Sequence, residues 1–109
     1  MFGRYSFDSQ GEQVLFDGRV IELTPKEYAL ALHFFQRRDR PLSRAYLLEC
    51  VWKSAAGLST RTLDMHVSRL RAKLQLRSEN GYRLQTVFGY GYRLDTYVSA
   101  AQDDVADAL

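Results

Sequence analysis

Apolar residues recur at helical spacing in residues 59–76. Leu63, Val67, Leu70 and Leu74 fall within roughly 60° of one another when each residue turns a helix by about 100°. Such a narrow aliphatic face predicts an amphipathic helix with one edge buried in a core.

A second stripe of this helix lies about 120° away from the aliphatic face. Its members carry hydrogen-bond donors, methyl groups or positive charge: Thr62, Met65, His66, Arg69 and Lys73. Exposed Lys and Arg on an amphipathic helix usually face water, so a solvated surface is one interpretation. A surface that binds an anion is the other, and the stripe alone does not decide between them.

Two further helices are predicted upstream, each with a polar start signal. Thr24-Pro25-Lys26-Glu27 combines a capping hydroxyl, a proline in the first turn and a glutamate for a capping box. A core helix is therefore expected from Pro25 to about Arg37, with His33 as a surface or hydrogen-bonded histidine. Ser43 is expected to cap a second helix over Arg44–Trp52.

Runs of β-prone residues predict a sheet before the helices and a hairpin after them. Asp17-Gly18 supplies the positive φ of a two-residue turn, and the glycines of residues 88–91 permit a second tight turn. The expected strands are Arg4–Phe7, Gln13–Phe16, Arg19–Leu23, Tyr82–Val87 and Tyr92–Asp95. The order predicts an α+β domain with an N-terminal antiparallel sheet, three helices and a C-terminal β-hairpin wing, a winged helix-turn-helix.

The length of 109 residues with 46% hydrophobic residues fits one domain with one modest core. We expect this domain to span residues 1–95. Residues 96–109 form an acidic tail, for which a disordered end and a weak amphipathic helix are both open.

Charge is distributed unevenly along the chain. Residues 1–35 carry a net charge of −2, residues 36–94 carry +8 and residues 95–109 carry −4. The basic part contains the amphipathic helix, and this asymmetry is typical of a face that binds nucleic acid.

Other classes of protein find little support in the sequence. A lone cysteine, Cys50, excludes an internal disulfide and fits a reducing cytoplasm, and no apolar run approaches the roughly 18 residues of a membrane span. No nucleophile–base pair, paired carboxylates, metal-ligand cluster or phosphate-binding glycine loop is apparent. We therefore expect no enzyme, no metal and no cofactor.

Four segments resemble, in order and spacing, the DNA-binding effector domain of OmpR/PhoB-type response regulators. They are LTPKEYALALHFFQRR, PLSRAYLLECVW, STRTLDMHVSRLRAKL and LQTVFGYGYRL. The resemblance covers about residues 3–95. It implies transcription control by two-component signalling, in which a receiver domain responds to a sensor kinase and effector domains bind promoter DNA as dimers. In this family the loop between the second and third helices contacts RNA polymerase. In this chain that loop corresponds to Lys53–Ser59.

The third predicted helix matches the family's recognition helix, so its polar stripe is expected to read bases in the major groove. Arg69 is the leading candidate, because a guanidinium pairs bidentately with guanine. Thr62 and Met65 are expected at thymine methyl groups, and His66 at a base edge or phosphate.

Five cations are expected at phosphates, which position a domain without specifying sequence. They are Arg44, Arg61, Arg71, Lys73 and Arg93. For Arg44, which stands unfavourably at a positive helix end, an ion pair with Asp39 or Glu49 is the alternative.

The wing tip departs from the family pattern, which commonly has arginine where this chain has Phe88, followed here by Tyr90. A phenyl ring cannot exploit the negative potential of a narrow minor groove. Packing against sugars, a protein contact and no contact at all remain open. A winged helix that has lost DNA binding and uses these aromatics to bind protein is the alternative function.

Overall fold

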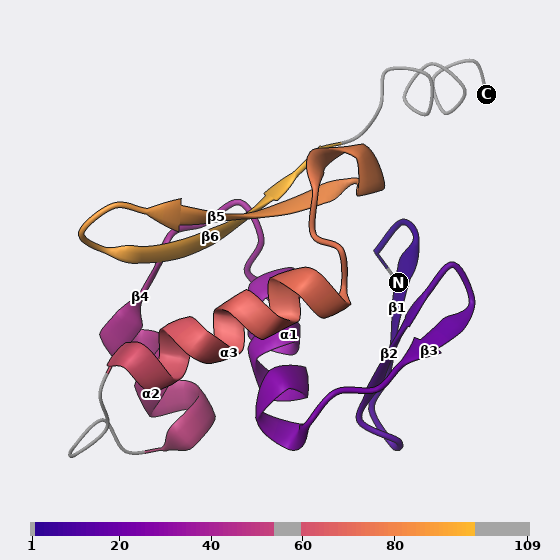
Figure 1. Ribbon diagram of the computed structural model, residues 1–109, viewed down its shortest axis with the longest axis horizontal. Coiled ribbons are helices and arrows are strands. Elements are labelled where there is room, and N and C mark those ends of the chain that lie inside the picture. Colours follow the sequence, from indigo (N-terminus) through magenta and orange to yellow (C-terminus); the bar gives the residue numbers. More distant parts are fainter. Residues whose placement is uncertain (1, 54–59, 98–109) are drawn as a thin grey trace.

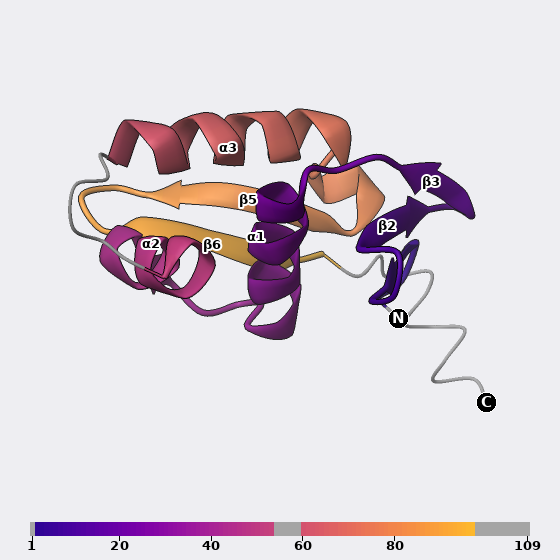
Figure 2. The same ribbon diagram turned by 90° about the horizontal axis from the view of Figure 1, so that it is seen from below.

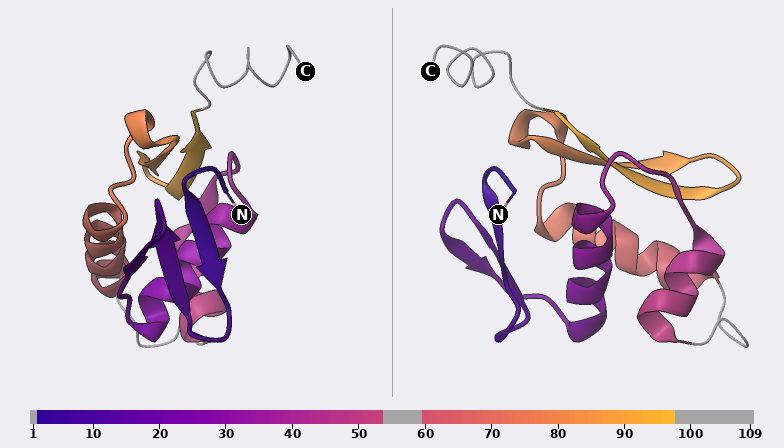
Figure 3. Two further views of the ribbon diagram at one scale, coloured as in Figure 1. Left: turned by 90° about the vertical axis from the view of Figure 1, so that its right-hand side faces the viewer. Right: turned by 180° about the vertical axis from the view of Figure 1, so that it is seen from behind.

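The computed structural model describes residues 2–53 and 60–97. An antiparallel sheet opens the chain, with β1 (Tyr5–Asp8), β2 (Gln13–Phe16) and β3 (Arg19–Ile21) in that order. The predicted hairpin at Asp17-Gly18 is confirmed, since both residues have positive φ and Phe16 pairs with Arg19. This sheet packs at the end of the molecule away from the wing tip (Figures 1 and 3).

Three helices follow. They are α1 (Pro25–Gln36), α2 (Arg44–Trp52) and α3 (Thr60–Lys73). Both predicted start signals are confirmed: the Thr24 hydroxyl and the Glu27 carboxylate complete a capping box, and the Ser43 hydroxyl accepts a hydrogen bond from the Tyr46 N–H. These caps satisfy N–H groups that have no partner within the helix.

The wing consists of β5 (Tyr82–Val87) and β6 (Gly91–Thr96), preceded by the short 3₁₀ turn η1 (Ser78–Asn80). The structure adds β4 (Leu42–Ser43), which the sequence did not predict and which pairs with β6. A strand of two residues has no alternation to detect. Its pairing makes the wing a three-stranded sheet in the order β4-β6-β5.

One core joins these parts, and the predicted aliphatic face of α3 lies in it. Leu63, Val67, Leu70 and Leu74 are each at most 1% exposed. Phe34 and Phe35 of α1 are buried in the same core. Figure 1 shows α1, α2 and α3 together beneath the β5–β6 hairpin, where α3 packs against both other helices. The opposite face of α3 is therefore left open.

Three predictions fall outside the described residues. The first is the loop Lys53–Ser59, of which residues 54–59 are not described. The second is whether the tail beyond Tyr97 is ordered, and the third is the assignment of residues 96–109 to a separate tail, of which residues 98–109 are not described. Within the described part, β6 ends at Thr96 and the Tyr97 N–H bonds to the Gly81 carbonyl.

Candidate nucleic-acid interface

The exposed face of α3 is centred on positions opposite its buried leucines. Arg61, Met65, Ser68, Arg69 and Ala72 are all exposed, and they fall within roughly 100° of one another on the helix. Met65 is 45% exposed, which is high for a large apolar side chain. This face carries two guanidinium groups, a thioether and a hydroxyl toward solvent.

Two members of the predicted stripe lie at the edge of this face. Thr62 and His66 are half-buried, and the His66 Nδ1 lies 2.8 Å from the Thr62 carbonyl oxygen. The His66 ring also meets Trp52 of α2 edge-on, with 5.0 Å between the ring centroids. The Nδ1 contact and the indole fix the orientation of the imidazole, so α2 helps to position this side of α3.

Lys73, predicted at a phosphate, has a partner inside the domain. Its Nζ donates to the Glu27 Oε1 at 2.7 Å, and Glu27 is only 1% exposed. Burial acts to raise the pKa of Glu27, but hydrogen bonds from Lys73 and from the Thr24 N–H outweigh it and lower this pKa. The ion pair joins the end of α3 to the start of α1. The structure thus favours a positioning role for Lys73.

Arg44 also has a partner, but not one of the two carboxylates named as alternatives. Instead of Asp39 or Glu49, its Nε donates to Asp64 Oδ1 of α3 at 3.2 Å. The Tyr92 hydroxyl of β6 donates to the same oxygen, and the Arg44 guanidinium lies 5.1 Å from the Tyr92 ring centroid. This cluster ties α2, α3 and the wing together.

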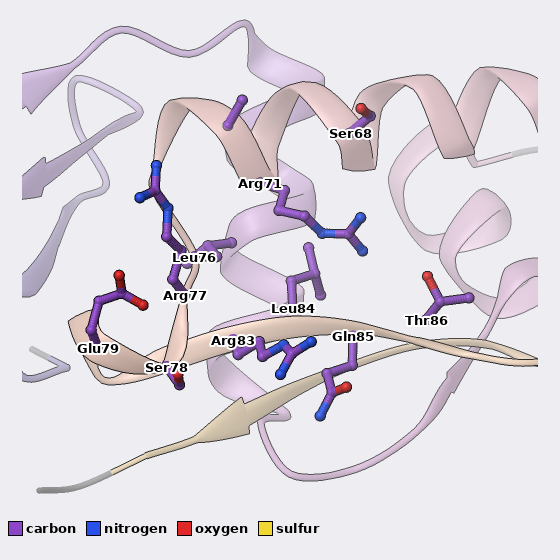
Figure 4. A pocket seen from close by; sticks show the side chains of 11 residues that line it. Ser68, Arg71, Leu76, Arg77, Ser78, Glu79, Arg83, Leu84, Gln85 and Thr86 are labelled. Carbon is purple, nitrogen blue, oxygen red and sulfur yellow. The ribbon is translucent and has the colours of Figure 1, made fainter.

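An open groove of about 770 Å³ runs between the second half of α3, η1 and β5. Its lining includes Arg71 of α3, Arg77 just before η1 and Arg83 of β5, with Glu79 as the one carboxylate among the lining residues. Figure 4 shows Arg71 reaching from α3 toward the wing, above Leu84. The Arg71 Nε is buried and has no hydrogen-bond partner in the described part of the chain. The groove thus presents an excess of cations beside the exposed face of α3.

The wing carries its most exposed side chains at the tip. Phe88 is 99% exposed and Tyr90 is 49% exposed. Arg93, predicted at a phosphate, forms an ion pair with Asp95 of the same strand. The hydrogen bond from Arg93 lowers the pKa of Asp95, against the effect of burial.

The sequence predictions did not include four residues that lie on this face or line the groove: Ser68, Arg77, Arg83 and Thr86. Ser68 lies in the middle of the exposed α3 face, and a helical wheel centred opposite the leucines would have found it. Arg83 and Thr86 line the groove because β5 runs beside α3, which no local pattern indicates. The predicted stripe lies about 120° from the buried leucines rather than directly opposite them, so it did not include Ser68.

Two features are absent from the described residues. No helix among them is long and apolar enough to cross a membrane. No group of three or more His, Cys, Asp or Glu side chains within residues 2–53 and 60–97 is arranged to hold a metal ion.

This three-helix domain, whose third helix exposes a basic face beside a β-hairpin, is a winged-helix domain. A family model described as "Transcriptional regulatory protein, C terminal" matches residues 18–94. The chain belongs to this family of response-regulator effector domains.

Individual relatives agree with this assignment. The transcriptional regulatory protein SrrA of Staphylococcus aureus is 37% identical over 95 residues, which cover 86% of this chain and 39% of SrrA. The DNA-binding domain of Bacillus subtilis CssR superimposes with a TM-score of 0.72 at 32% identity, covering 83% of this chain and 98% of that domain. The Klebsiella pneumoniae RstA DNA-binding domain, solved in complex with the RstA box, has a TM-score of 0.73 at 26% identity, covering 87% and 94%.

Proposed function

We propose that this domain binds double-stranded promoter DNA with α3 in the major groove, as the effector domain of a two-component response regulator. The observation that carries the proposal is the exposed α3 face with its basic side chains. The groove between α3, η1 and β5, lined by Arg71, Arg77 and Arg83, lies directly beside this face. The RstA domain supports it, because that relative was solved in complex with the RstA box.

Base reading is assigned to the centre of this face. Arg69 is exposed and long enough to pair with both acceptors of a guanine. Met65 and Thr62 are suited to thymine methyl groups, and His66 to a base edge at the margin. Ser68 joins them as a short donor and acceptor at the middle of the face.

Phosphate contacts are assigned to the cations that flank this face. Arg61 and Arg71 keep their predicted role, and Arg77 and Arg83 join them because they line the same groove. Arg44 and Lys73 instead hold α3 against α2 and α1 through Asp64 and Glu27. Four neutralised phosphates correspond to a slope of about −4 in a plot of log affinity against log salt concentration. The Arg93 contact stays a prediction.

Replacing Arg83 with alanine tests the groove. We expect Arg83→Ala to weaken binding to every duplex sequence about equally and to make the salt slope shallower by about 1. Arg40→Ala is the matched control, because Arg40 is also exposed but lies in the loop between α1 and β4, and β6 separates β4 from the groove strand β5. Fluorescence anisotropy with labelled duplexes from 50 to 300 mM salt (roughly the range in which counterion release is resolved) gives both slopes. Equal slopes for the two variants would remove Arg83 from the interface.

The complete regulator extends this proposal. The chain spans 39% of the length of SrrA, so a receiver domain, its sensor kinase and dimers on promoter DNA are proposed partners of the longer protein. An RNA polymerase contact through Lys53–Ser59 also stays a proposal, since residues 54–59 lie outside the described structure.

A further inference from the structure

Phe88 is an unusual side chain for the surface of a small domain. It is 99% exposed, whereas the next most exposed large hydrophobic residue among the described ones, Val20, is 51% exposed. Covering the apolar surface of a phenyl ring removes that surface from water and lowers the free energy. The exposure therefore points to a partner that covers the ring.

The stem beneath Phe88 holds the backbone of the wing tip in a defined place. The Tyr90 N–H bonds to the Val87 carbonyl at 3.0 Å and closes the turn. The Tyr90 carbonyl in turn accepts a hydrogen bond from the Arg44 N–H at 3.1 Å, which fixes the tip to the start of α2. The backbone of the tip therefore loses little conformational freedom when the ring binds.

The position of the tip relative to α3 indicates which surface it meets. The hairpin runs beside α3, and its tip lies at the same end of the molecule as Thr60, where α3 begins (Figures 1 and 2). Thr86 lines the groove next to α3, and Phe88 follows two residues later, about 7 Å further along an extended chain. If α3 lies in a major groove, a tip offset from the helix in this way would face the flanking sugar-phosphate backbone and the adjacent minor groove.

The chemistry of the tip limits what it can do there. Residues 87–91, Val-Phe-Gly-Tyr-Gly, carry no charge, so the tip cannot neutralise a phosphate. Uncharged aromatic rings bind nucleic acids by stacking on bases, and apolar side chains of minor-groove proteins wedge between base steps.

We infer that Phe88 acts as an aromatic wedge, which enters the minor groove beside the α3 site and partly unstacks one base step. This inference rests on the proposed DNA binding and adds a second, uncharged mode of recognition to it. It predicts a preference for flexible pyrimidine–purine steps at that position, because these unstack most easily.

The test uses the duplex recovered by selection from a random pool, with 2-aminopurine placed at successive positions on both flanks. Unstacking raises the fluorescence of this base analogue. We expect the unaltered domain to raise it about threefold at one or two adjacent positions and Phe88→Ala to abolish the rise, as stacking energetics predict. Phe88→Ala should also weaken binding about tenfold and leave the salt slope unchanged, since no charge is lost.

Two further variants make the result specific. Phe88→Arg should bind with a salt slope steeper by about 1 and without the fluorescence rise, because arginine replaces the wedge with charge. Val20→Ala, which shortens an exposed apolar side chain of the N-terminal sheet, should match the unaltered domain.

Other outcomes overturn the inference in distinguishable ways. If the domain binds DNA and Phe88→Ala changes neither affinity nor fluorescence, the wedge is wrong and the proposed function stands. If Phe88→Ala instead abolishes self-association measured without DNA, the ring binds a second copy. If the unaltered domain binds no duplex at 50 mM salt (roughly where phosphate contacts are strong), the wedge and the proposed function fail together.

Discussion

Glu27→Ala is expected to lower the free energy of unfolding by about 2 kcal/mol. Glu27 is 1% exposed, and its carboxylate joins the start of α1 to the end of α3. It accepts hydrogen bonds from the Thr24 N–H in the capping box and from the Lys73 ammonium. Alanine removes both contacts and leaves a small cavity. The effect stays below that of a fully buried pair because Lys73 is 39% exposed and can be hydrated. Urea denaturation of both proteins at pH 7 measures the difference.

Lys73→Met separates the ion pair from the cap. It leaves the Glu27 carboxylate buried with its Thr24 contact, so we expect a loss of about 1 kcal/mol and a coupling of similar size in the double-mutant cycle. Arg69→Ala, on the exposed face of α3, should stay within about 0.5 kcal/mol of the unaltered domain. A Glu27→Ala domain as stable as the unaltered one would contradict this account of the core.

The lowered pKa of Glu27 predicts how the stability difference between the unaltered domain and Glu27→Gln depends on pH. A carboxyl group whose pKa is lower in the folded state stabilises the fold above its unfolded value, here 4.5, and this stabilisation is lost as pH falls through the folded pKa. The stability difference between the two proteins should therefore be largest at neutral pH and shrink in acid.

Gly91→Ala is expected to cost about 3 kcal/mol or more. A Cβ at this position would lie 2.0 Å from the Leu42 carbonyl oxygen and 3.0 Å from the Ser43 Cα, both of which belong to the backbone of β4. Backbone cannot move aside as a flexible side chain can, so β4 and β6 must separate. Thermal unfolding followed by circular dichroism measures the loss.

Gly89→Ala is the matched control on the same hairpin. A Cβ there would meet nothing within 4 Å, and the cost of about 1 kcal/mol comes only from its φ of +72°. A Gly91→Ala domain that is no less stable than Gly89→Ala would show that β4 does not hold the wing.

The features predicted correctly from the sequence are the local ones. The capping box, the Ser43 cap and the bounds of α2 depend on residues within one helical turn, so the sequence around them is sufficient. The burial of the α3 leucines follows from helical period alone.

The features that were missed depend on the tertiary fold. Lys73 and Glu27 are 46 positions apart, and Arg44 and Asp64 are 20 apart, so neither pair leaves a local pattern. Both cations were predicted at phosphates, and that prediction could not take these partners into account, because an unpaired charge and a paired one look the same in a sequence. β4 exists only through its pairing with β6.

The exposed face of α3 as a reader of base sequence is the centre of this account. Selection of bound duplexes from a random pool, carried out with the unaltered domain, Arg69→Ala and Arg40→Ala, tests it most directly. We expect Arg69→Ala to lose preference at one or two base positions, worth about 1–3 kcal/mol each, while Arg40→Ala selects the unaltered sequence. Identical sequence preferences for all three proteins would contradict the assignment of base reading to this face.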